Sequence, residues 1–220
     1  MSTGRLRIAV LVSGSGTNLQ SILDAAKRGD VPVEIALVSS NREGVPALAR
    51  AERAGVPSLT IAHRDYPDRE AFDQKLVDAL RAAQVSLVVL AGFMRLLSPA
   101  FIEAFPSRII NIHPGLLPAF PGTHAVRQAL THGVKIAGCT VHFVDAQTDS
   151  GPIIAQAAVP VLDDDDERSL SARILREEHR ILVDALNAFV EGRLQIVAGE
   201  PGQRPRVLTR PRAPVGNREA

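Results

Sequence analysis

The sequence predicts one α/β domain, in which a doubly wound, mostly parallel sheet carries an antiparallel addition towards the C-terminus. In the first half of the chain, short apolar runs alternate with amphipathic stretches, a pattern typical of strand–helix units. In the second half, the apolar runs Gly138–Val144 and Pro152–Val161 follow each other across a short loop and predict an antiparallel pair. The 220 residues, 45% of them hydrophobic, are enough for a sizeable core.

Strands and helices alternate in the predicted parallel part. The expected strands are Arg7–Val12, Val33–Ser39, Val56–Ile61, Val85–Leu90 and Arg108–Ile112. Helices are expected over Asn18–Lys27, Pro46–Ala54 and Arg69–Ala83, where apolar residues recur at helical spacing. The run Val85–Leu90 is the most apolar, and strands covered on both faces read as continuous apolar runs, so we expect it to be central.

A long helix is expected over Glu167–Glu191, after the antiparallel pair. The acidic run Asp163–Glu167 stands at its start, where negative charge favours a helix N-terminus. With these elements the predicted architecture is a Rossmann-like sheet.

Composition excludes several classes of protein. The 25 Lys and Arg balance 24 Asp and Glu, so the chain is neither a strongly acidic nor a strongly basic disordered protein. The one cysteine, Cys139, excludes a disulfide framework and fits a reducing, cytoplasmic location. No apolar run approaches the roughly 20 residues that span a bilayer, so we expect no membrane association.

Positive charge gathers at the C-terminus. Residues Gln203–Ala220 hold five arginines, three prolines and one acidic residue, with no apolar periodicity. We therefore expect residues 1–202 to form the domain and residues 203–220 to be a basic, flexible tail. Arginines without interleaved aromatic residues are weak evidence for nucleic-acid binding, so we expect no nucleic-acid partner.

A glycine loop, Ser13–Asn18, lies between the first strand and its helix. Glycines let the backbone approach an anion, and the helix N-terminus offers free N–H donors. A dinucleotide site would want a small residue at Leu19 and an acidic residue after the second strand, where Ser39–Arg42 stands instead. The loop therefore favours a single phosphate on a small substrate, although a merely tight turn is the alternative.

A second candidate site begins at the end of a parallel strand, in Asn111–Gly122. Ligands of open α/β sheets collect at that edge. Strand alternation puts Asn111 and His113 on the same side, so an amide and an imidazole can address one centre. A histidine at a strand end is often only a boundary residue, but the amide and the proline-rich turn favour a site.

The third candidate is the polar loop Asp145–Pro152. Asp149 can cap a turn of its own backbone, or it can orient a histidine. His113, His124 and His142 with Asp149 could instead bind a metal, but their spacing follows no ligand motif, so we expect no metal.

Four motifs occur in order along the chain: SGSGTNLQ, AGFMRLLSP, NIHPGLLPAFPG and HFVDAQTDSGPII. Together they resemble the folate-dependent glycinamide ribonucleotide formyltransferases of purine biosynthesis, over roughly residues 7–200. The resemblance implies the formyltransferase fold. It also implies transfer of the formyl group of 10-formyltetrahydrofolate, as co-substrate, to the amine of 5'-phosphoribosylglycinamide, giving formylglycinamide ribonucleotide and tetrahydrofolate. The oligomeric state is open, with a homodimer as one candidate.

The resemblance also implies roles for particular residues. The catalytic residues would be Asn111, His113 and Asp149. The phosphoribosylglycinamide ligands would be Gly16, Thr17, Asn18, Leu175, Arg176, Glu177 and Glu178, with Glu178 accepting the ribose hydroxyls. The folate ligands would be Arg69, Met94, Arg95, Leu96, Leu97, Asn111, Asp145, Ala146, Gln147, Thr148 and Asp149. One departure is Gly115, where many relatives have serine.

The expected chemistry suits these side chains. Attack of the amine on the formyl carbon develops an oxyanion, to which Asn111 and a protonated His113 can donate. Asp149 would favour the charged imidazole and, through a water, carry the proton from the amine to the folate nitrogen. Cys139, inside a predicted strand, is expected to pack rather than to act as a nucleophile.

Three other functions remain open at this point. They are a hydrolase that releases formate from the same folate, an NADP-dependent reductase that uses the glycine loop with Arg42, and a nucleic-acid-binding domain that uses the tail.

Overall fold

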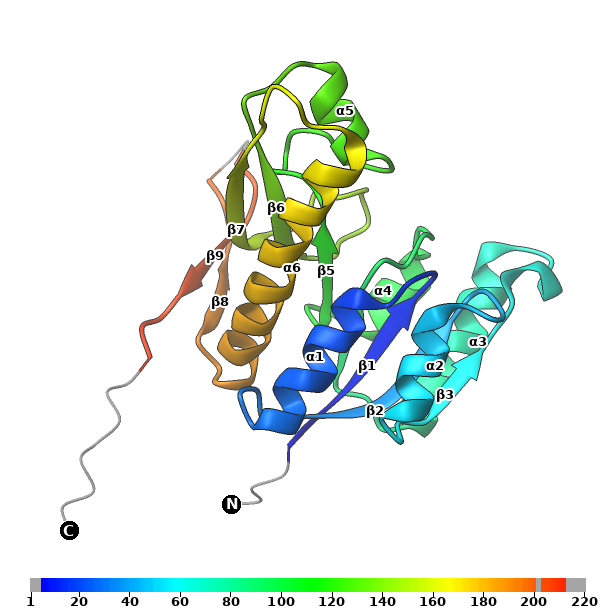
Figure 1. Cartoon of the computed structure of the whole chain (residues 1–220). Coiled ribbons are helices and arrows are strands. Elements are labelled where there is room, and N and C mark those ends of the chain that lie inside the picture. Colours follow the sequence, from blue (N-terminus) through cyan, green and yellow to red (C-terminus); the bar gives the residue numbers. More distant parts are fainter. Residues whose placement is uncertain (1–4, 201–202, 213–220) are drawn as a thin grey trace, which may run out of the picture.

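The computed structural model describes residues 5–200 and 203–212. Its centre is a seven-stranded sheet with the order β3-β2-β1-β4-β5-β6-β7 (Figure 1). Strands β1 to β5 run parallel, whereas β6 and β7 are antiparallel additions, so the predicted fold class is confirmed. The strands are β1 (Leu6–Val12), β2 (Val33–Ser40), β3 (Ser58–Thr60), β4 (Leu87–Leu90), β5 (Ile109–His113), β6 (Ile136–Phe143) and β7 (Ile153–Pro160).

Helices cover both faces of the sheet. They are α1 (Thr17–Arg28), α2 (Pro46–Arg53), α3 (Arg69–Ala82), α4 (Pro99–Ala104), α5 (Ala125–Thr131) and α6 (Glu167–Val190), with a 3₁₀ turn, η1 (His63–Asp65). Buried side chains of α1, α2, α5 and α6 pack on one face, and those of α3 and α4 on the other. None of the helices that the structure describes is both long and apolar enough to cross a membrane.

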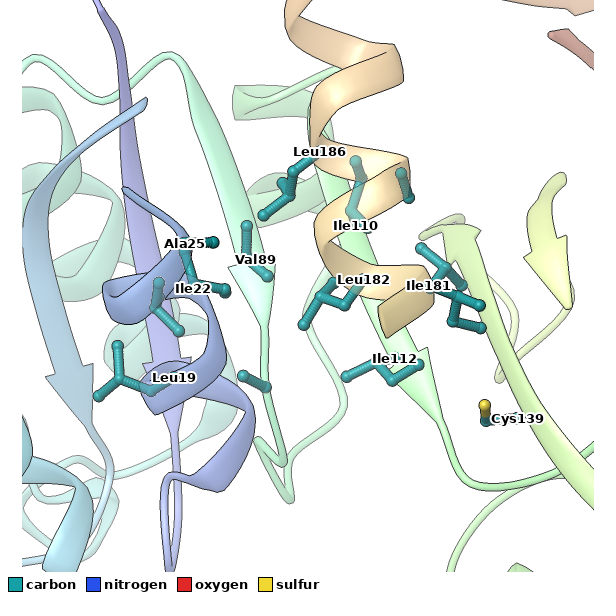
Figure 2. Close-up of a cluster of buried hydrophobic side chains, with 14 of the residues drawn as sticks. Leu19, Ile22, Ala25, Val89, Ile110, Ile112, Cys139, Ile181, Leu182 and Leu186 are labelled. Atoms are coloured by element: carbon teal, nitrogen blue, oxygen red, sulfur yellow. The ribbon is translucent and has the colours of Figure 1, made fainter. Parts of the chain in front are cut away.

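The larger core cluster joins α1 and α6 to the middle of the sheet. Figure 2 shows it, with Leu19 and Ile22 of α1, Ile181 and Leu186 of α6, and Ile110 of β5. All five side chains are at most 2% exposed. Burying one such side chain stabilises a fold by about 1.5–3 kcal/mol. This cluster therefore holds the start of α1 and the middle of α6 beside each other.

The start of α6 is fixed by its acidic residues. Asp166 caps the helix, since its carboxylate accepts from the Ser169 N–H at 2.7 Å while the Ser169 hydroxyl accepts from the Asp166 N–H at 3.0 Å. The neighbouring Asp165 pairs with Arg173, eight residues later, which holds the pKa of Asp165 below its usual range.

Most predicted elements are confirmed within one to three residues, and β4 is the central strand of the order, as predicted. The short helices α4 and α5 were not predicted from the sequence. With six and seven residues, they are too short to show a helical period.

The C-terminal region differs from expectation. A second, two-stranded sheet pairs β8 (Leu194–Val197) with β9 (Arg206–Thr209), and Val207 packs against the main core. Strand β9 lies within the segment 203–220, for which the sequence predicts flexibility throughout. The composition of this segment does not predict a strand, because the order of β9 comes from its pairing with β8. The last part of the expected tail, 213–220, lies outside the described residues, as do 201–202 at the expected domain boundary.

Candidate active site

The glycine loop meets the start of α1 in a conformation that needs glycine. Gly16 is the N-cap of α1 with a φ of 71°, and a Cβ there would lie 2.6 Å from Ala47 Cβ. No side chain caps this end of the helix. Its first N–H groups are therefore available to an anion, as the sequence predicts.

Asn18 and Glu178 connect this loop to the middle of α6. Asn18 Nδ2 donates to Glu178 Oε2 at 2.7 Å, across 160 residues of sequence, and both side chains are buried. Burial raises the pKa of Glu178, and the hydrogen bond from Asn18 opposes that shift. A buried carboxylate with one oxygen so engaged can accept hydroxyl donors of a ligand with the rest of its capacity.

A groove of about 600 Å³ is lined by residues of α1 and α6. Its lining is mostly polar and includes Thr17, Arg50, Arg176, His179 and Arg180. Arg50 Nε also donates to the Ser15 carbonyl at 2.9 Å. The groove therefore places several positive side chains, together with the carboxylates of Asp24 and Asp184, near the start of α1.

The predicted residues of the α6 turn have different surroundings. Glu177 forms an ion pair with Arg180 at 2.7 Å, Arg176 is exposed in the groove, and Leu175 is half-buried. Of the two adjacent glutamates, Glu178 is the one that faces the glycine loop.

His113 and Asp149 lie together at the end of β5. His113 is 4% exposed, and its Nδ1 lies 3.4 Å from Asp149 Oδ2. Its Nε2 lies 2.9 Å from the Phe120 carbonyl oxygen, which can only accept, so Nε2 carries a proton. The carboxylate of Asp149 also accepts from the Gly122 N–H at 2.7 Å. Asp149 therefore faces the histidine rather than capping its own turn.

Asn111 completes the cluster from β5 and contacts a residue without an assigned role. Asn111 Nδ2 lies 3.1 Å from His142 Nε2 on the neighbouring strand β6. That same nitrogen of His142 lies 3.7 Å from Asp149 Oδ1. An amide, two imidazoles and a carboxylate thus meet at one edge of the sheet.

The turn after His113 is held by two polar side chains, the buried Thr140 and the exposed Gln156. The Thr140 hydroxyl donates to the Gly115 carbonyl at 2.6 Å and accepts from the Leu117 N–H at 3.0 Å. Gln156 donates to both the Leu117 carbonyl and Thr140 Oγ1. These bonds anchor the loop whose carbonyl contacts His113, because buried polar groups are costly to leave unpaired.

Gly115 lies against the imidazole of His113. A Cβ at this position would be 3.0 Å from His113 Nε2 and 3.2 Å from its Cδ2. A serine there would therefore press on the imidazole in its present position, so the departure from the family pattern affects the ring directly.

The expected folate turn follows β4. Met94 and Leu96 are exposed, at 61% and 59%, whereas Leu97 is buried. The Met94 N–H donates to Ser13 Oγ at 2.8 Å, and Arg95 lies over the Phe72 ring. Ser13 thus connects the glycine loop to this turn.

The other residues expected to bind folate are Arg69 and those of the loop 145–149. Arg69 begins α3 and pairs with Glu70 at its exposed surface. In the loop 145–149, Asp145 accepts from the Gln147 N–H and the Ser150 hydroxyl, while Ala146, Gln147 and Thr148 are exposed. The loop's internal capping is therefore done by Asp145, which leaves Asp149 free for His113.

Cys139 is fully buried in β6, and burial raises the pKa of its thiol to about 12. The prediction that it packs rather than attacks is therefore supported. Among the described residues, no three His, Cys, Asp or Glu side chains are grouped to hold a metal ion.

Several residues that support the site were not predicted from the sequence. His142 was considered only as a metal ligand, and Thr140, Gln156 and Ser13 were given no supporting role. One signal was available: Thr140 and His142 are polar residues at alternate positions of an otherwise apolar strand, which places both on one face.

A helix start with uncapped N–H groups and a partly buried amide–imidazole–carboxylate cluster, both at the carboxyl edge of a doubly wound sheet, are the features of an α/β enzyme for a phosphorylated small substrate. A family model described as formyl transferase matches residues 6–186. The chain belongs to this family.

Relatives agree with this assignment. The phosphoribosylglycinamide formyltransferase of Mycobacterium tuberculosis is 50% identical over 191 residues, covering 87% of this chain and 88% of the relative. A solved structure of glycinamide ribonucleotide transformylase 1 from Symbiobacterium toebii is 54% identical, with a TM-score of 0.90 over 95% of each chain. The trifunctional purine biosynthetic protein adenosine-3 of Drosophila melanogaster is 50% identical, but this chain spans only 14% of its length.

Proposed function

We propose that this chain transfers a formyl group from 10-formyltetrahydrofolate to the amine of 5'-phosphoribosylglycinamide, a step of purine biosynthesis. One observation carries the proposal: in a member of the formyl transferase family, the cluster of Asn111, His113 and Asp149 shares a sheet edge with the glycine loop. Relatives that match this chain over most of their length carry the corresponding name. A cytoplasmic location and a homodimer stay predictions.

The phosphate of the amine substrate would bind at the start of α1, against the N–H groups of Gly16 to Asn18. Glu178 would accept the ribose hydroxyls, since its carboxylate is buried and has Asn18 as a donor on one oxygen. Arg176 would add positive charge at the groove entrance. This arrangement would place the substrate's amine towards the catalytic cluster.

The folate would bind between the turn after β4 and the loop 145–149. Backbone groups of Met94 to Leu97 would hold the pterin, beside exposed apolar surface from Met94 and Leu96. The 10-formyl group would then lie near Asn111 and His113 at the end of β5.

Asn111 and His113 would stabilise the oxyanion that forms when the amine attacks the formyl carbon. The Nε2 proton of His113 is donated to the Phe120 carbonyl in this structure, and the formyl oxygen would replace that acceptor. Asp149, whose Oδ2 lies 3.4 Å from Nδ1, would orient the imidazole and, through water, pass the amine proton to the folate nitrogen. The chemistry needs no covalent intermediate.

The test is a turnover assay of the purified full chain with both substrates. Absorbance follows the folate product, and a separate formate assay follows hydrolysis. We expect folate product only when the amine substrate is present. If formate is released equally fast with and without the amine substrate, the protein is a hydrolase instead. If no folate product forms under neutral conditions with both substrates present, the proposal is refuted.

A further inference from the structure

His142 lies directly opposite Asn111 in the antiparallel pairing of β5 with β6, and its side chain is 2% exposed. Each of its ring nitrogens has one close partner. Nδ1 lies 2.8 Å from the carbonyl oxygen of Phe143, and Nε2 lies 3.1 Å from Asn111 Nδ2. The ring is therefore held at both ends.

The chemistry of these partners determines where the proton of His142 resides. A carbonyl oxygen can only accept, so Nδ1 must carry the hydrogen. In a neutral imidazole the other nitrogen then has a lone pair, so Nε2 accepts. An amide presents either its NH₂ or its oxygen, and only the NH₂ of Asn111 can satisfy that lone pair.

The surroundings favour the neutral ring. Burial lowers the pKa of His142, and a positive charge on the neighbouring His113 acts in the same direction whenever that ring is protonated. The Phe143 carbonyl and the carboxylates of Asp149 and Asp145 oppose the shift. His142 Nε2 therefore stays an acceptor at neutral pH.

We propose that His142 is a positioning residue for formyl transfer: its Nδ1–H tautomer, locked by Phe143, fixes the amide of Asn111 with its NH₂ towards the site. One N–H of Asn111 is donated to His142, and the second is then directed to the formyl oxygen. This inference rests on the proposed function, because it takes Asn111 to be an oxyanion donor. The lock converts a freely flipping amide into a preorganised donor, which is the property that oxyanion stabilisation needs.

The tautomer can be observed without any substrate. Nitrogen-15 NMR of the histidine rings in the full chain distinguishes Nδ1–H, Nε2–H and doubly protonated rings. His142→Met identifies the His142 signal, and His132→Met is the matched control, since His132 is exposed on the surface. We expect a neutral Nδ1–H ring for His142 at pH 7. A neutral Nε2–H ring or a charged ring would overturn the proposal.

Kinetics test the consequence for Asn111. His142→Met removes the acceptor and replaces the imidazole with an apolar side chain of similar size. This variant should lower kcat about tenfold or more, with KM within about threefold of the native value. His142→Gln offers an amide oxygen at a reach similar to that of Nε2 and should recover most of that loss. His132→Met should leave kcat unchanged. Equal losses in the Met and Gln variants would show that only packing was disturbed.

A double-variant cycle separates this inference from the proposed function. In the Asn111→Ala background, His142→Met should have no further effect on kcat, because residues that act as a unit are non-additive. If Asn111→Ala itself retains full kcat, the assigned role of Asn111 in the proposed function fails. If Asn111→Ala lowers kcat but the two losses multiply, His142 does not act through Asn111, and the positioning inference alone fails.

Discussion

The two ends of the candidate site use different kinds of chemical group. The phosphoribosyl end, Gly16 to Asn18 with Glu178, relies on backbone N–H groups at a helix start and on one buried carboxylate. The catalytic end, Asn111, His113, His142 and Asp149, consists of side chains that hydrogen-bond or pair with one another or with loop backbone. Backbone donors need only the correct helix geometry, whereas a side-chain cluster needs every neighbour in place. Substitutions at the first end should therefore change mainly the affinity for the amine substrate. Substitutions at the second end should lower mainly kcat.

The largest effect is expected at the catalytic end. His113→Ala removes one oxyanion donor together with the partner of Asp149, and should lower kcat about 10²–10³-fold while KM changes little. Asp149→Asn should lower kcat by less, and the double variant should be close to His113→Ala, because the pair acts as a unit. Steady-state kinetics of the three variants measure this. Multiplying losses would place Asp149 outside the catalytic unit.

A backbone effect is expected next, in the glycine loop. Gly16→Ala puts an alanine in a left-handed backbone conformation and places its Cβ 2.7 Å from Ala47 Cα. The substitution should lower the free energy of unfolding by about 2 kcal/mol or more. Gly14→Ala is the matched control, since a Cβ there meets nothing within 4 Å. Chemical denaturation measures both. Equal costs at the two glycines would mean that the close approach to α2 is not what constrains this loop.

Glu178→Gln should separate affinity from stability at the phosphoribosyl end. Losing the carboxylate should raise KM for the amine substrate about tenfold, or 1.4 kcal/mol, with little change in kcat. In the native enzyme that affinity should fall as the pH drops through a pKa above the ordinary glutamate value.

Stability should change in the opposite direction. A raised pKa means that the folded state binds the proton more tightly than the unfolded chain does. Glu178 therefore lowers the free energy of unfolding as the pH rises from the glutamate pKa of the unfolded chain through the higher pKa of the folded state. The glutamine variant lacks that penalty, and its melting temperature relative to the native enzyme should improve from pH 4 to pH 7, a range around the ordinary glutamate pKa. A constant difference over this range would contradict the assignment.

The smallest effect is expected far from both ends, at the C-terminal strand. Removing residues 206–220 deletes β9 and the packing of Val207, and should lower the melting temperature by about 2–4 °C, or 1 kcal/mol, with kcat retained. Removing 213–220 alone is the control. Because Arg204, which reaches the Ser150 carbonyl, is kept in both, a fall in kcat would show that β9 supports the catalytic loop.

Local pattern was enough for the main elements and for one end of the site. Apolar periodicity predicts β1 to β7, α1 to α3 and α6 because these segments are long enough to show a period of two or 3.6 residues. The glycine loop could be predicted because its ligand groups belong to consecutive residues at one helix start. Strand alternation predicts one centre for Asn111 and His113. The addition of Asp149 to that centre came from the family resemblance, since nothing local links residues 113 and 149.

The sequence by itself thus determined the fold class, the order of the main elements and the position of the glycine loop at a helix start. Only the tertiary structure decided which side chains are partners: Asn18 with Glu178 across 160 residues, Asn111 with His142 across 31, and β8 with β9. The physical reason is register. Periodicity states which face a residue occupies, but a shift of one residue between β5 and β6 would turn His142 to the opposite face and leave Asn111 without its partner.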